Sequence, residues 1–148
     1  MEAIYNLSNG IKVHYLKYPN KANNICLIIG FKNGASIDKY GKEGTTHLLE
    51  HLIIKNFEKN GINELLENKG FDVNGETGIS DMVLILKSNK NNVEKVINLM
   101  VKALNSIKIS KRMLFNERKI VKAEYYERLN DLNANVDFTL MRHGLYFY

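Results

Sequence analysis

The sequence predicts an α+β fold in which an antiparallel sheet carries helices mainly on one face. Two regions support this prediction, since strand-like segments fill the first thirty residues and a second pair lies near residues 71–87. The third observation is the spacing of apolar residues after residue 91, which is typical of amphipathic helices. A chain of 148 residues is long enough for one domain with a core, so we expect residues 1–148 to form a single domain.

The predicted strands begin at the N-terminus. Ala3 to Leu7 and Ile11 to Tyr18 flank Asn9-Gly10, a dipeptide that is typical of two-residue hairpin loops. Asn24 to Phe31 is strongly apolar and is expected to be a central strand of the sheet. Cys26 lies within this run, so we expect its side chain to be buried.

A helix is predicted after a polar, glycine-containing stretch. Thr45 or Thr46 is a suitable N-cap for a helix that continues to about Asn56. A second, short helix is expected from Ile62 to Asn68, with Gly70 ending it.

The second half of the chain returns to strands and then to helices. Phe71 to Lys87 is expected to form two strands around a Gly75–Gly78 turn, with Met82 to Leu86 as the buried part. Helices are then expected over three segments: Asn91 to Ile107, Ser110 to about Leu129, and Val136 to Leu145.

Charge and composition exclude several classes of function. The formal net charge is +5, but the lysines are spread along the whole chain, so we expect no nucleic-acid partner. No apolar run approaches the ~20 residues that span a bilayer, so we expect no membrane partner. The N-terminus lacks the features of a signal peptide, and one cysteine fits a reducing compartment. The expected location is the cytoplasm.

The most informative segment is His47-Leu48-Leu49-Glu50-His51. On a helix that turns about 100° per residue, His51 lies about 40° around from His47, and Glu50 about 60° the other way. Two histidines one turn apart can bind one zinc ion at about 2.0–2.1 Å, and Glu50 is placed to take a proton from a water that the metal activates. This H-x-x-E-H order is the reverse of HExxH. The competing interpretation is two surface histidines, yet two of only four fall in this turn.

A catalytic zinc ion needs three protein ligands, so a carboxylate must come from elsewhere. The predicted helix that begins at Ser110 offers Glu117, Glu124 and Glu127. Glu117 and Glu124 lie within about 20° of one line and roughly 10 Å apart along the axis, so they cannot easily bind the same ion. The spacing leaves open which of them binds the metal and which supports a histidine.

Three segments together resemble the pitrilysin and insulin-degrading family of zinc peptidases, which includes the mitochondrial processing peptidases. They are the histidine motif, Asn74-Gly75-Glu76-Thr77, and the pair Glu117 and Glu124. The resemblance extends from about Asn9 to Leu129. The histidine motif is specific, the glutamate pair less so, and Asn-x-x-Thr alone is a weak signal. The sequence departs from the family pattern at Gly75, where alanine is usual.

The resemblance implies a role for each matched residue. Zinc would be held by His47, His51 and Glu124, with Glu50 as the catalytic base. Glu117 would be a supporting acid behind the metal ligands, and Asn74 would help to hold the backbone of the substrate. The implied fold is a single domain of the pitrilysin and processing-peptidase type.

The expected activity is that of a zinc-dependent metalloendopeptidase that hydrolyses peptides or small proteins. Family members are far longer, with two or four related domains that close around the substrate, so this zinc-binding domain is partial relative to them. We therefore expect a homo-oligomer, or a second chain that supplies the closing half. The alternative is a non-catalytic peptide-binding or regulatory subunit of a processing-peptidase-like assembly, although such a subunit has no need of Glu50.

The last four residues, Leu145-Tyr146-Phe147-Tyr148, form an apolar and aromatic tail. Ends of chains are usually polar and frayed. We expect this tail to contact a partner, or else to fold back onto the domain.

Overall fold

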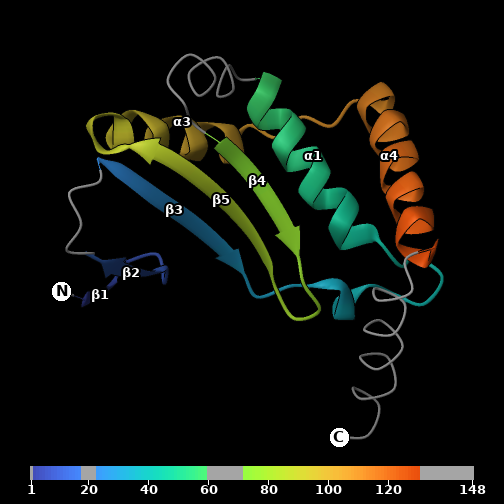
Figure 1. Cartoon of the computed structure of the whole chain (residues 1–148), viewed down its shortest axis with the longest axis horizontal. Coiled ribbons are helices and arrows are strands. Elements are labelled where there is room, and N and C mark those ends of the chain that lie inside the picture. The colour runs from blue at the N-terminus through green and yellow to red at the C-terminus, as the bar shows by residue number, and fades with distance from the viewer. Residues whose placement is uncertain (1, 18–22, 60–71, 131–148) are drawn as a thin grey trace, which may run out of the picture.

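The computed structural model describes residues 2–17, 23–59 and 72–130. These residues form a two-stranded sheet, a three-stranded sheet and three α-helices, and the helices lie mainly on one side of the larger sheet (Figure 1). All strand pairs are antiparallel. The predicted α+β class is therefore confirmed.

The N-terminal hairpin pairs β1 (Glu2–Asn6) with β2 (Lys12–Leu16). The amide of Leu7 donates to the carbonyl of Ile11 at 2.9 Å, and the amide of Gly10 donates to the carbonyl of Leu7 at 3.0 Å. Gly10 has φ +85°, which a glycine adopts without strain. The predicted hairpin is confirmed, but its loop has three residues, because the left-handed glycine follows a four-residue turn instead of forming a two-residue one.

The larger sheet has the order β3 (Asn24–Phe31), β5 (Met82–Asn89), β4 (Asp72–Thr77). The expectation that residues 24–31 form a central strand is wrong for the described residues, since β5 pairs on both sides and β3 lies at an edge. A run of apolar residues shows that a strand is partly buried, but not which neighbours it pairs with.

Cys26 corrects a second expectation, because its side chain is exposed. It pairs with Lys87 on the outer face of the sheet, whereas Leu27 pairs with Leu86 on the face that the helices cover. Successive side chains of a strand point to opposite faces, so an apolar run through β3 necessarily places half of its residues outside.

The turn between β4 and β5 also lies later than expected. It closes at Gly78, whose amide donates to the carbonyl of Asp81 at 2.8 Å. Gly75 is inside β4, where it pairs with Leu84. This shift places Gly75 and Thr77 on the helix-facing side of the strand, opposite buried residues of β5.

α1 (Thr45–Lys59) is capped by a residue that precedes it by several positions. The Asp38 carboxylate accepts from the amide of Gly44 at 2.8 Å and from the amide of Thr46 at 3.0 Å. The Thr46 hydroxyl also donates to Asp38, at 2.7 Å, and the Thr45 hydroxyl donates to the carbonyl of Lys42. The predicted start of the helix is confirmed, but the side-chain cap comes from Asp38.

The core lies between the sheet and two helices, α1 and α3 (Val93–Asn105). Its largest fully buried side chains are Phe57, Leu84, Leu86, Met100 and Asn56. Asn56 is the polar member, and its amide donates to the carbonyl of Ala103 at 3.0 Å, which ties α1 to the end of α3. A short 3-10 turn, η2 (Lys90–Asn92), leads into α3.

α4 (Lys111–Asn130) packs against α1 and forms one side of the molecule (Figure 1). The Ser110 hydroxyl accepts from the amide of Met113 at 3.1 Å, so the predicted start at Ser110 is confirmed. Glu117 is the one buried residue of this helix. α4 therefore contributes acidic side chains to the space beside α1 and little to the apolar core.

Several expectations concern segments outside the described residues. They are the helix from Ile62 to Asn68 with Gly70, the helix from Val136 to Leu145, and the tail Leu145 to Tyr148. Among the described residues, no helix is both long enough and apolar enough to cross a membrane.

Candidate metal centre

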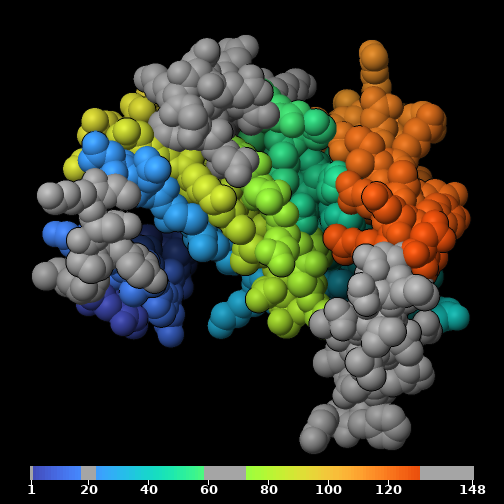
Figure 2. Space-filling view, viewed as in Figure 1, coloured from blue at the N-terminus to red at the C-terminus, as the bar shows by residue number. Residues whose placement is uncertain are grey.

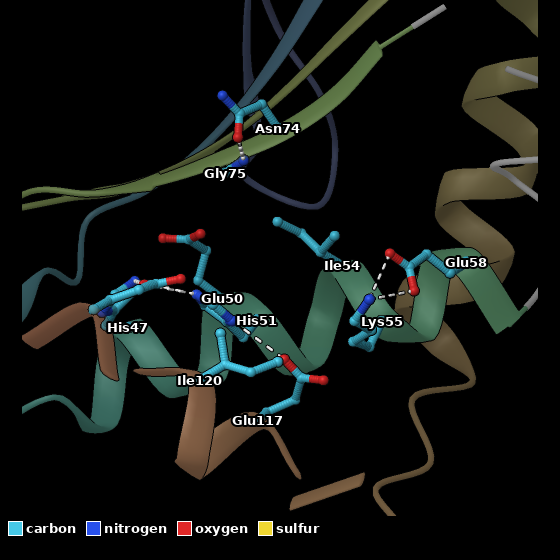
Figure 3. A pocket seen from close by; sticks show the side chains of 11 residues that line it. His47, Glu50, His51, Ile54, Lys55, Glu58, Asn74, Gly75, Glu117 and Ile120 are labelled. Carbon is cyan, nitrogen blue, oxygen red and sulfur yellow. Dashed lines mark hydrogen bonds and ion pairs between the residues drawn. The ribbon is translucent and has the colours of Figure 1, made fainter. Parts of the chain in front are cut away.

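α1, β4 and α4 enclose a cavity of about 390 Å³. The middle of α1 forms its floor, with His47, Glu50 and His51 on the turns that face the other two elements (Figure 3). β4 contributes Asn74 and Gly75, and α4 contributes Glu117, Ile120 and Glu124. The helical spacing predicted for the histidine motif is confirmed, since residues 47–51 lie within α1.

Three side-chain atoms converge at one end of this cavity. The Nε2 atoms of His47 and His51 are 3.2 Å apart. A carboxylate oxygen of Glu124, Oε2, lies 3.3 Å from the first and 3.4 Å from the second. The three atoms form a nearly equilateral triangle between α1 and α4.

The triangle has the dimensions of a zinc site. Ligand atoms placed tetrahedrally at 2.0–2.1 Å from one ion are roughly 3.3 Å from each other. Two imidazole nitrogens and one carboxylate oxygen also form a donor set that catalytic zinc uses, with the fourth position left for water or substrate. The residues present therefore fit a zinc ion, both in donor chemistry and in spacing.

His51 is oriented from behind by Glu117. Oε2 of Glu117 lies 3.2 Å from Nδ1 of His51, and the Glu117 side chain is buried at 4% exposure. A proton on Nδ1 that is shared with this carboxylate leaves Nε2 bare and directed at His47 and Glu124. The two acids of α4 thus take the two different positions that their seven-residue spacing required.

His47 is held in the neutral form by its surroundings. Burial lowers its pKa below the ordinary value of 6.5, and the neighbouring His51 and Arg128 lower it further, while Glu50 and Glu124 act in the opposite direction. Near pH 7 the imidazole of His47 is neutral, which is the state that can offer a lone pair to a metal.

Glu50 faces the cavity but points away from the triangle. Within the described residues, His47, Glu50 and His51 each offer a ligand atom within 4.8 Å of the others. Oε2 of Glu124 lies 3.3 and 3.4 Å from the Nε2 atoms of His47 and His51. The Glu50 carboxylate is instead directed toward β4 (Figure 3). The two carboxylates therefore occupy different positions. Glu124 lies beside the two histidine nitrogens, and Glu50 lies beside the open part of the cavity.

Asn74 lies on the β4 wall of the cavity and is exposed. Its side-chain oxygen accepts from the amide of Gly75 at 2.9 Å. Among the described residues β4 is an edge strand, so its outer backbone groups are available to another extended chain.

For two residues of this region the sequence predicts no role: Thr77, which appears there only as the last residue of the Asn-x-x-Thr segment, and Asp38. The Thr77 hydroxyl donates to Oε2 of Glu50, and Asp38 caps the helix that carries the motif. Thr77 lies 27 residues from Glu50 and Asp38 lies 8 residues before Thr46. The alternation of β4 would have placed Thr77 on the same face as Gly75, but only the sheet register shows that this face meets α1.

Comparisons with known proteins show which family the chain belongs to and which fold it shares. A model of the insulinase family, peptidase family M16, matches residues 15–144. The chain is 26% identical over 121 residues to the zinc protease PqqE of Helicobacter pylori (strain ATCC 700392 / 26695), covering 80% of the chain and 27% of that protein. It shares the fold of a protease from Helicobacter pylori whose crystal structure is known, with a TM-score of 0.72 and 24% identity over 86% of the chain and 31% of that protein.

The chain thus spans about a third or less of the length of these two relatives. The family match, in contrast, covers most of the chain and includes every residue of the cavity. The chain belongs to the insulinase family, peptidase family M16.

Proposed function

We propose that this chain is a zinc-binding peptidase domain, partial relative to its longer relatives, that hydrolyses peptide bonds in peptides or small proteins. The observation that carries the proposal is the triangle of His47 Nε2, His51 Nε2 and Glu124 Oε2, with sides of 3.2–3.4 Å. Membership of the family and the similarity to a zinc protease support it.

In this proposal His47, His51 and Glu124 hold the zinc ion, and Glu117 fixes the ring of His51. A zinc ion held there would polarise the scissile carbonyl and lower the pKa of water toward neutrality.

Glu50 is the proposed general base. It takes a proton from the attacking water and later delivers it to the leaving amine, so the same carboxylate serves both steps. Its burial at 5% exposure excludes bulk water from the base, while its position beside the cavity leaves it within reach of a bound peptide.

The proposed substrate lies as an extended segment along β4. An edge strand offers unpaired amide and carbonyl groups to such a segment, and Asn74 is placed on this strand to contact the substrate backbone. We further propose that a homo-oligomeric partner or a second chain closes the cavity, because both relatives are about three times as long as this chain. The single free cysteine fits a reducing compartment, which supports a cytoplasmic location.

Glu50→Gln tests the proposal. The amide is similar in size but is a very weak base, so peptidase activity should fall by about 10²–10⁴-fold while zinc content stays unchanged. Zinc is measured by elemental analysis and activity with a quenched fluorescent peptide, each with and without a candidate partner chain. Full activity in the variant would exclude Glu50 as the base. A wild-type chain that binds zinc and peptide but cuts nothing in any pairing would favour the peptide-binding subunit.

A further inference from the structure

The Glu50 carboxylate is held by β4, at a place where this strand has no side chain to obstruct it. The Thr77 hydroxyl donates to Oε2 of Glu50. Two residues earlier, Gly75 lies so close that a Cβ there would be 2.6 Å from Oε1 and 2.7 Å from Cδ and Cγ of Glu50. Figure 3 shows the carboxylate directed at this strand and away from Glu117.

The strand register explains why one strand supplies both features. Gly75 pairs with Leu84 and Thr77 with Met82, and both partners are buried on the helix-facing side of the sheet. Residues two apart in a strand share a face, so Gly75 and Thr77 both face α1. The first provides the space for the carboxylate, and the second provides a hydrogen-bond donor at its end.

We propose that Thr77 is a positioning residue for the general base Glu50. The absence of a side chain at Gly75 leaves the space in which the Glu50 carboxylate reaches the Thr77 hydroxyl. The inference rests on the proposed function, in which Glu50 moves the proton. Thr77 occupies Oε2, which leaves Oε1 as the oxygen that accepts a proton from water. A glutamate side chain has three rotatable bonds, and an unrestrained side chain loses conformational entropy when it is fixed in the transition state. Holding one carboxylate oxygen in advance removes most of that loss.

Gly75→Ala should act on Glu50 and leave the strand in place. The three atoms nearest to the new methyl group all belong to the Glu50 side chain, which can rotate. The carboxylate therefore moves away from the Thr77 hydroxyl. Gly75→Ala should resemble the loss of that hydroxyl.

The first test uses the stability of the metal-free chain and needs no activity. Thr77→Val keeps the shape of the side chain but removes the donor from a buried carboxylate, so Tm should fall by roughly 3–8 °C. Thr77→Ser keeps the hydroxyl and should lose much less. In a Glu50→Leu background, Thr77→Val should leave Tm nearly unchanged, because no carboxylate is left to satisfy. Thr45→Val is the matched control, since the Thr45 hydroxyl bonds only to the carbonyl of Lys42 in an exposed position. An equal drop in both backgrounds would overturn the proposal.

The second test uses kinetics of the zinc-loaded chain. Thr77→Val and Gly75→Ala should each lower kcat by about 10- to 100-fold, with KM and zinc content unchanged, and Thr77→Ser should restore most of the rate. The double variant Gly75→Ala/Thr77→Val should be no slower than either single variant. Full kcat in Thr77→Val, or a Thr77→Ser variant as slow as Thr77→Val, would overturn the proposal. If the wild-type chain has no activity in any setting, the proposed function fails, and the stability comparison still decides whether Thr77 holds Glu50.

Discussion

At the scale of single residues, the proposed metal site depends on three side chains from two helices. Removing His47, His51 or Glu124 leaves two ligands, which are too few to hold a catalytic zinc ion. His47→Ala, His51→Ala and Glu124→Ala should each lower zinc well below one ion per chain after dialysis against a weak chelator. His14→Ala is the control, because His14 is exposed on β2. Full zinc in all three variants would show that the site assignment is wrong.

The same measurement of zinc binding distinguishes the roles of the two glutamates of α4. Glu117 contacts Nδ1 of His51 and is not among the three converging atoms, so Glu117→Ala should weaken zinc binding by about 10–100-fold without abolishing it. Glu124→Ala should be the more severe change. The reverse order would exchange the roles of the two acids.

The lowered pKa of His47 predicts how stability depends on pH. Burial disfavours the charged imidazole in the folded chain, so the unfolded chain takes up a proton first as pH falls. The stabilising contribution of neutral His47 is complete above the ordinary pKa of 6.5 and is lost as pH falls from 6.5 toward the lower folded value. Tm of the metal-free chain, followed from pH 7.5 to 5.5, should fall less steeply in His47→Ala than in the wild type. Parallel curves would contradict this prediction.

The sequence alone predicts the relative positions of site residues that lie close together along the chain. His47, Glu50 and His51 lie within five positions, so helical geometry alone places them together. Glu124 was implied by resemblance, since spacing could not choose between it and Glu117. Thr77 was matched as part of the Asn-x-x-Thr segment, but its contact with Glu50 was not predicted, because that contact depends on which face of β4 meets α1, and this is a property of the assembled sheet.

At the scale of elements, the start of α1 fixes where the histidine motif lies. Asp38 accepts three hydrogen bonds from Gly44 and Thr46, and His47 is the next residue of the helix. Asp38→Ala should lower the free energy of unfolding by about 0.5–2 kcal/mol and weaken zinc binding as well. Denaturant unfolding measures the first effect and chelator competition the second. Glu127→Ala, which changes an exposed carboxylate of α4, should alter neither. Unchanged stability in Asp38→Ala would show that Asp38 is not the cap.

The charged residues of α4 are distributed unevenly around the helix, which their positions along the sequence do not show directly. The helix has six exposed basic residues: Lys111, Arg112, Arg118, Lys119, Lys122 and Arg128. At about 100° per residue the first five fall within roughly 120° of the helix circumference, on the side opposite Glu117 and Glu124, whereas Arg128 lies on the side of the two glutamates. Lys119 lies over the ring of Phe115 at 4.3 Å, which holds part of this surface in place. One face of α4 therefore carries Glu117, Glu124 and Arg128 toward the proposed metal site, and the opposite face carries most of the basic residues of the helix.

At the scale of the whole molecule, the N-terminal hairpin lies apart from the core and at the other end from α4 (Figure 2). The pairs Ala3 with Tyr15 and Tyr5 with Val13 place four apolar side chains on one face of the hairpin. Leu7 and Ile11 extend the same face. Tyr5 is 56% exposed and Ile11 is 54% exposed, so this face has no cover in the described chain. An isolated hairpin is marginally stable in water, and a contiguous apolar surface of this kind usually marks an interface.

The length of the relatives and the exposed hairpin lead to one prediction about assembly. Both relatives are about three times as long as this chain, and the hairpin and the cavity are two open surfaces for a second body to cover. We expect the chain to self-associate, or to bind a second chain, at micromolar concentration, with activity per chain rising as association proceeds. Tyr5→Ser/Val13→Ser should weaken association by removing apolar area worth about 25 cal/mol per Å². Ile4→Ser is the control, since Ile4 pairs with His14 on the opposite face. Sedimentation equilibrium measures the mass of each variant. A wild-type chain that stays monomeric, with activity per chain independent of concentration, would show that this domain works without a second body.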